Sequence, residues 1–115
     1  MKEGDIQRLV MLAASGQGCM ILRNNCGTLK NPAGIPIKFG VGNPGGSDLI
    51  GITPVTITPD MVGQTVGVFT ALEIKTPKGR ATPEQIRFIE AVRKHGGIAG
   101  IARSVEDALS LINNQ

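Results

Sequence analysis

The sequence has no Trp and no Tyr, and only three of its 115 residues are Phe. Aromatic side chains supply much of the buried area of an ordinary core, so Ile, Val, Leu and Ala must fill this one. Sixteen Gly also raise the entropy that the chain loses on folding. A core of this kind gains stability from a partner subunit, and the composition therefore favours a homodimer.

Histidine and cysteine are almost as scarce. His95 is the only histidine, which excludes His-based triads and multi-histidine metal sites. Cys19 and Cys26 are the only cysteines, and they have no Cys or His neighbours at the spacing of a zinc site. Since nothing in the sequence indicates secretion, we expect two reduced thiols, although the sequence leaves a disulfide open.

Long apolar runs are absent as well, and the longest apolar stretches are too short to span a bilayer. No basic-then-apolar leader with a cleavage site opens the sequence. We therefore expect a cytoplasmic protein with no membrane contact. The formal net charge of +3 is compatible with a polyanionic partner, but solubility alone explains such a charge equally well.

Three segments have helical patterns. Residues 2–15 carry apolar side chains at helical spacing, and Gly16 is a suitable end. A second helix begins at Thr82, where Thr82, Pro83 and Gln85 supply an N-cap, a proline at the first helical position and a capping box. Ser104 caps a third helix, which has an apolar stripe of Val105, Ala108, Leu109 and Ile112.

Strands are predicted between these helices. Residues 27–46 are rich in Gly, Pro and Asn, which predicts a long loop with a brief strand near residues 37–41. The order is roughly α-β-β-β-α-β-α, with three or four strands before the second helix. This order predicts one α/β domain over residues 1–115, with a mixed β-sheet flanked by helices. The other strands are expected at residues 19–23, 48–52, 66–75 and 98–102, and the third of these is the clearest.

Residues 66–75 bring two charges to the end of an apolar run. Because side chains alternate along a strand, Glu73 and Lys75 share one face with Phe69 and Ala71. Charges that follow a buried run are costly unless they are paired or bound to a metal. On this segment alone, a solvated strand end is the favoured interpretation.

Asp48 adds a second carboxylate at the start of an apolar strand, directly after Gly45-Gly46-Ser47. If that strand lies beside residues 66–75, Asp48 and Glu73 can bind one hard divalent cation, which prefers oxygen ligands. Such a cation activates water and neutralises charge on a phosphate, and Lys75 can stabilise the transition state. An Asp beside glycines is more often only a turn residue, so the argument depends on the combination.

Gly46-Ser47-Asp48, followed by Glu73-x-Lys75, resembles the catalytic signature of the PD-(D/E)xK nuclease superfamily. The surrounding pattern resembles the virus-type replication-repair nuclease (VRR-NUC) family over nearly the whole chain. Besides the site residues, the matching elements are Glu3 with Ile6-Gln7, Arg23-Asn24-Asn25-Cys26-Gly27, Phe39-Gly40 through Asp48-Leu49-Ile50-Gly51, Gly79-Arg80 with Gln85, and Gly96-Gly97 before Ser104-Val105-Glu106-Asp107.

This resemblance implies roles for individual residues. Asp48 and Glu73 would be metal ligands, helped by the main-chain carbonyl of Ile74, and Lys75 would be the catalytic lysine. Gln85 would reach toward the site, although the capping box explains it as well. Glu3 would face the metal directly or through water, although an acid also suits the first turn of a helix.

The resemblance also implies an activity. We expect a Mg²⁺- or Mn²⁺-dependent endonuclease that acts on DNA, and the stand-alone phage or prophage members of the family suggest a homodimer that cuts four-way (Holliday) junctions. For such a protein the compartment would be the cytoplasm of a bacterial host. A monomeric flap or nicking nuclease and a non-catalytic DNA-binding module are the alternatives. The residues expected to contact DNA are Arg23, Lys78, Arg80 and Arg87, with further basic side chains at Lys30, Lys38, Arg93 and Lys94.

Overall fold

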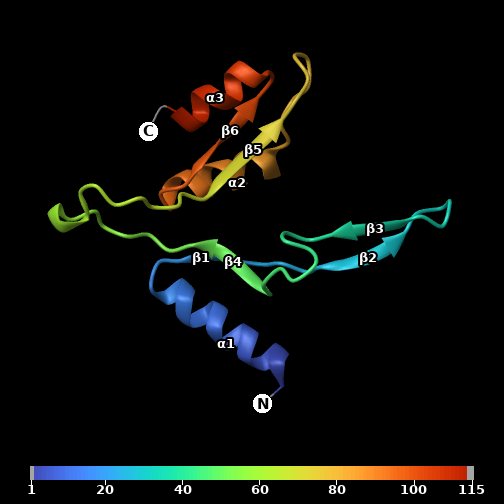
Figure 1. Cartoon of the computed structure of the whole chain (residues 1–115), viewed down its shortest axis with the longest axis horizontal. Coiled ribbons are helices and arrows are strands. Elements are labelled where there is room, and N and C mark those ends of the chain that lie inside the picture. Colours follow the sequence, from blue (N-terminus) through green and yellow to red (C-terminus); the bar gives the residue numbers. More distant parts are fainter. Residues whose placement is uncertain (1, 114–115) are drawn as a thin grey trace. The chain divides into compact units, whose positions relative to one another are not determined.

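The computed structural model describes residues 2–113. Its α/β fold confirms the predicted class, but five strands precede the second helix instead of three or four (Figure 1). The chain divides into two compact units, Met1–Gly51 and Ile52–Gln115, and each is described by itself. The elements are α1 (Glu3–Gly16), β1 (Met20–Arg23), β2 (Gly27–Lys30), β3 (Pro36–Phe39), β4 (Leu49–Ile52), the 3₁₀ turn η1 (Pro59–Met61), β5 (Thr70–Ile74), α2 (Pro83–Lys94), β6 (Ile98–Ala102) and α3 (Val105–Asn113).

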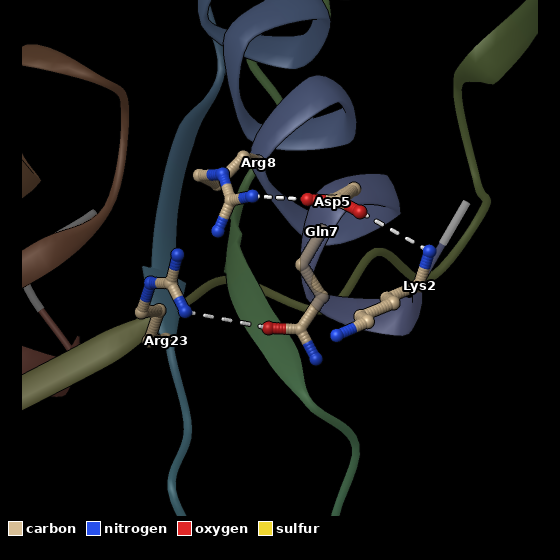
Figure 2. A network of polar contacts seen from close by, with 5 residues as sticks. All are labelled: Lys2, Asp5, Gln7, Arg8 and Arg23. Carbon is tan, nitrogen blue, oxygen red and sulfur yellow. Dashed lines mark hydrogen bonds and ion pairs between the residues drawn. The ribbon is translucent and has the colours of Figure 1, made fainter.

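The first unit begins with α1, which packs against β1. One polar contact joins these elements: Arg23 of β1 donates to the Gln7 side chain of α1 at 3.5 Å (Figure 2). Within α1, Asp5 pairs with Arg8. The half-buried positions of α1 are Asp5, Gln7, Met11 and Ala14, whereas Leu9 is 54% exposed. The side of α1 that is half-buried is therefore not the apolar stripe that the sequence predicts.

Strands β2 and β3 form an antiparallel hairpin, in which Leu29 pairs with Ile37 and Thr28 with Lys38. The turn is closed by Asn31, whose side chain accepts from the Ile35 backbone N–H at 2.9 Å. The brief strand predicted near residues 37–41 is present as β3, but residues 27–30, predicted as loop, form a second strand. β2 was not predicted, because its four residues begin with Gly and carry little hydrophobic signal.

Strands β1 and β4 form a separate two-stranded sheet, and both were predicted within one residue of their observed bounds. Their backbones approach closely at Gly51. A Cβ at this position would lie 1.9 Å from the Met20 carbonyl oxygen, so only glycine fits without a shift of the strand. At the other end of the pair, the Asn24 backbone N–H donates to the Asp48 carbonyl at 2.8 Å, which holds the start of β4 against the end of β1.

The second unit is built around the parallel pair β5–β6, with Glu73 opposite Ile101. The two helices cover different faces of this pair. A Cβ on Gly97 would meet Val92 of α2, and a Cβ on Gly100 would meet Leu111 of α3. Val92 and Ala102 are fully buried and form the centre of this small core.

The expected strand at residues 66–75 is only half as long as predicted. The parallel register begins at the pair Thr70–Ile98, and Gly97 precedes Ile98 directly. Residues before Thr70 therefore have no partner strand in this sheet, and Val66 is 51% exposed. β6 and the Thr82 capping box were predicted correctly, as was the cap of α3 by Ser104. None of the described helices combines the length and hydropathy that a membrane span requires.

Candidate active site

The face of β5 that carries Glu73 and Lys75 is its more covered face. Ala71, Glu73 and Lys75 are half-buried, whereas on the other face Leu72 is half-buried and Thr70 and Ile74 are exposed. Ile74, the largest apolar side chain on that outer face, is 66% exposed. The end of the strand thus keeps two charged groups half-buried beside an exposed Ile74, which is unusual for a strand with a purely structural role.

These half-buried charges have no counter-ions in the described part of the chain. No hydrogen bond or ion pair from residues 2–113 reaches the Glu73 carboxylate or the Lys75 ammonium group, and the two do not pair with each other. The Lys75 backbone N–H donates to the Ala102 carbonyl at 3.1 Å, which fixes the strand end. A partly desolvated carboxylate without a partner is a suitable ligand for a hard cation.

A cavity of about 340 Å³ lies beside Glu73, between β5 and α2. Glu84, Gln85 and Phe88 of α2 line it together with Glu73. The Gln85 side chain accepts from the Thr82 backbone N–H at 2.9 Å, and the Gln85 N–H donates to the Thr82 hydroxyl at 3.1 Å. The capping role of Gln85 is therefore confirmed, and the same residue borders the space next to Glu73.

Asp48 and Glu3 belong to the first unit. Asp48 is exposed and directly precedes β4, and its carbonyl oxygen accepts from the Asn24 backbone N–H at 2.8 Å. Glu3 is exposed as the first residue of α1. Within either unit, the described residues include no group of three His, Cys, Asp or Glu side chains arranged to hold a metal. The second unit by itself brings Glu73 and Gln85 to one cavity, and Lys75 follows two residues after Glu73.

The basic residues expected to contact DNA are exposed, but they differ in their contacts. Arg87 forms a 3.4 Å ion pair with Glu84, next to the cavity. Arg23 is oriented by Gln7 of α1 (Figure 2). Lys78 and Arg80 lie in the segment between β5 and α2. Arg93 is engaged within the second unit, because its Nε–H donates to the Ala99 carbonyl at 2.8 Å.

Arg103 has a role that the sequence did not indicate. Its Nη1 group donates to the carbonyls of Thr76 and Gly79, both at 2.6 Å, and lies 3.4 Å from the Pro77 carbonyl. One guanidinium group thus holds the turn that carries Lys78. The only sequence signal for this contact is a basic residue directly after a buried strand, which is a weak signal.

An α/β fold in which a strand ends in a covered Glu-x-Lys pair is typical of nuclease-like domains with the PD-(D/E)xK signature. The chain belongs to the VRR-NUC family, because the sequence model of the VRR-NUC domain matches residues 17–106. The match includes Asp48, Glu73, Lys75 and Gln85, whereas Glu3 precedes it. No curated protein and no solved structure matches the chain significantly. The chain is therefore a nuclease domain of a family that acts on DNA.

Proposed function

We propose that the protein is a divalent-metal-dependent endonuclease that hydrolyses phosphodiester bonds in branched DNA, with Asp48, Glu73 and Lys75 at its catalytic centre. One observation carries the proposal: Glu73 and Lys75 are half-buried on one face of β5 and have no partner among residues 2–113. Keeping two half-buried, unpaired charges beside so small a core is costly. Binding a cation and a phosphate would remove that cost.

Asp48, Glu73 and the main-chain carbonyl of Ile74 would hold the metal, with Glu3 as a further ligand, directly or through water. These groups are all oxygen donors, which fits Mg²⁺ or Mn²⁺ and does not fit a soft metal. Like Glu73, the Asp48 carboxylate has no partner in the described part of the chain. When bound, the cation supplies activation of water and neutralises charge on the phosphate.

The side chains of the second unit would act on the phosphate and the attacking water. Lys75, which shares a face with Glu73, would stabilise the additional negative charge on phosphorus-bound oxygens in the transition state. In hydrolysis, the water oxygen forms a bond to phosphorus, the ester P–O bond breaks, and a proton reaches the leaving oxygen. Gln85 would orient water from the cavity that it shares with Glu73.

Lys78 and Arg80 would contact the DNA backbone close to the cut, because they directly follow the strand that carries Glu73 and Lys75. They also precede the N-terminus of α2, where the helix dipole favours anions. Arg87 and Arg23 would add further contacts to the DNA backbone. Such contacts position a nuclease without reading the base sequence, which suits recognition of DNA shape.

A homodimer would present two catalytic centres to a four-way junction, because each chain carries one set of site residues and a two-fold axis matches two opposed strands. The apolar stripe of α3 supports this arrangement. Val105 is 71% exposed, Leu109 is 51% exposed and Ile112 is 42% exposed. A continuous apolar patch on a soluble domain commonly marks an interface.

Cleavage of labelled single-stranded, duplex, flap and four-way DNAs, with Mg²⁺, Mn²⁺ or EDTA, tests the proposed activity. We expect cutting of the four-way junction in either metal and none in EDTA. Cutting of flaps alone would contradict the four-way junction as the substrate and would still support the nuclease activity. Absence of cutting on all four DNAs in both metals would instead favour a non-catalytic DNA-binding module.

Sedimentation at micromolar concentration tests the homodimer. We expect a species near twice the chain mass of 12.0 kDa. Leu109→Glu should produce the monomer and convert paired cuts of a junction into single nicks. Val62→Glu is the matched control, because Val62 is 83% exposed and lies outside α3. A wild-type monomer that nicks junctions would contradict the dimer and leave the nuclease assignment intact.

A further inference from the structure

Asn24 is the one buried polar residue among residues 2–113, with 8% of its surface exposed. It follows β1 directly and contacts both ends of the loop that leads from β3 to Asp48. A buried amide is costly unless its hydrogen-bonding groups are satisfied. The contacts of Asn24 therefore indicate what the residue contributes.

The carboxamide of Asn24 bonds both ends of this loop. Its Oδ1 accepts from the Val41 N–H at 2.8 Å, and its Nδ2 donates to the Val41 carbonyl at 2.8 Å and to the Ser47 carbonyl at 3.0 Å. Both amide hydrogens are therefore used. The Asn24 backbone N–H also donates to the Asp48 carbonyl at 2.8 Å. Asn24 thus holds the backbone carbonyls of Ser47 and Asp48. These two groups flank the Cα atom of Asp48, from which its side chain extends.

The loop between these anchors has little other support. It contains no helix or strand, and Gly42 and Gly45 have φ angles of 76° and 92°, which few other residues tolerate. Gly46 closes the loop so tightly that a Cβ there would lie 1.9 Å from the Val41 carbonyl oxygen. Asn43 binds the loop to the Gly27 and Phe39 carbonyls of the hairpin, and the Cys26 thiol donates to the Val41 carbonyl at 3.6 Å.

We propose that Asn24 is a positioning residue that holds Asp48 ready to bind the divalent cation. The inference rests on the proposed function, because it takes Asp48 as a metal ligand. Asp48 is exposed and its carboxylate has no partner among the described residues, so its direction depends on the backbone that Asn24 fixes. Without the amide, the loop would sample many conformations, and the cation would have to order it on binding.

Asn24→Ala should therefore raise the Mn²⁺ concentration for half-maximal cleavage by about 10- to 100-fold, the usual effect of removing a group that orients a metal ligand. The maximal rate at saturating Mn²⁺ should stay close to that of the wild type, because Asn24 does not touch the phosphate. Gly46→Ala should have the same effect, because its methyl group would displace the Val41 end of the loop. Asn31→Ala is the matched control: it removes the hydrogen bond that closes the β2–β3 turn, outside this loop, and should leave the Mn²⁺ dependence unchanged.

Two measurements do not depend on cleavage. Calorimetric titration with Mn²⁺ alone should show the same weakening for Asn24→Ala and Gly46→Ala. Hydrogen exchange in the metal-free protein should become faster in residues 41–48 of Asn24→Ala, while β5 and β6 keep their protection. If Asn24→Ala does not fold, the Mn²⁺ titration of Gly46→Ala and the comparison of its hydrogen exchange in residues 41–48 with that of the wild type test the inference instead.

Several results would overturn the inference. A folded Asn24→Ala or Gly46→Ala protein with wild-type Mn²⁺ affinity would show that the loop needs no positioning. A lower maximal rate at unchanged Mn²⁺ affinity would place Asn24 in the chemistry or in the fold. If the wild type binds Mn²⁺ without cutting any DNA, the proposed nuclease activity fails, and the calorimetric comparison of Asn24→Ala still tests the inference.

Discussion

Replacement of Arg103 by Ala tests how the second unit presents its DNA-binding turn. The change removes two short hydrogen bonds, to Thr76 and Gly79, and a longer one to Pro77. A hydrogen bond from a charged donor contributes about 1.5–3 kcal/mol. Because Arg103 is exposed, we discount the whole set to about 1–2 kcal/mol. For a chain of this size, such a loss lowers Tm by about 4–8 °C.

DNA affinity should fall as well, because Lys78 would lose its fixed position. Ordering one loop residue costs about 1–2 kcal/mol, so binding should weaken about tenfold. Circular dichroism gives Tm, and fluorescence anisotropy of labelled DNA in EDTA gives the affinity without cleavage. Arg8→Ala, which removes an exposed ion pair in α1, is the control and should change Tm little. Wild-type Tm and affinity in Arg103→Ala would refute this reasoning.

Two further predictions concern the site. Lys75→Ala should reduce turnover far more than it reduces DNA affinity measured in EDTA, because the ammonium group acts chiefly on charge that develops in the transition state. Equal losses in turnover and affinity would indicate that Lys75 only binds phosphate. Thr82→Ala and Gln85→Ala should each destabilise α2 by about 1 kcal/mol, since each removes one half of the capping box. Only Gln85→Ala should also slow cleavage at saturating metal, and equal cleavage by the two variants would leave Gln85 with a capping role alone.

Local signals were enough to predict the parts of the fold that depend on neighbouring residues. The Thr82 capping box and the Ser104 cap were read from the sequence because each involves residues three positions apart. β6 was predicted with its observed bounds because it is a short apolar run between two helices. The length of β5 was wrong because a strand extends only as far as its partner, and the position of Ile98 is not visible in residues 66–75.

The candidate site divides in the same way. Glu73 and Lys75 were predicted on one face because alternation along a strand is local, and their half-burial agrees with that prediction. Asn24 and Arg103 received no role because their contacts join residues 17 or more positions apart. A polar side chain gives no sign in the sequence of which distant carbonyl it will reach. Family resemblance included Asn24 in a motif, but only the structure shows its contacts.

The central claim is that Asp48 and Glu73 hold one divalent cation for hydrolysis of DNA. The most direct test measures metal-dependent cleavage of a labelled four-way junction by Asp48→Ala and Glu73→Ala. The controls are Asp60→Ala and Glu90→Ala, whose carboxylates are exposed and lie outside the site. With folding confirmed by circular dichroism, both site variants should lose more than about 100-fold in rate, and both controls should cut like the wild type. Wild-type cutting by Asp48→Ala and Glu73→Ala at the same Mg²⁺ concentration would contradict the account.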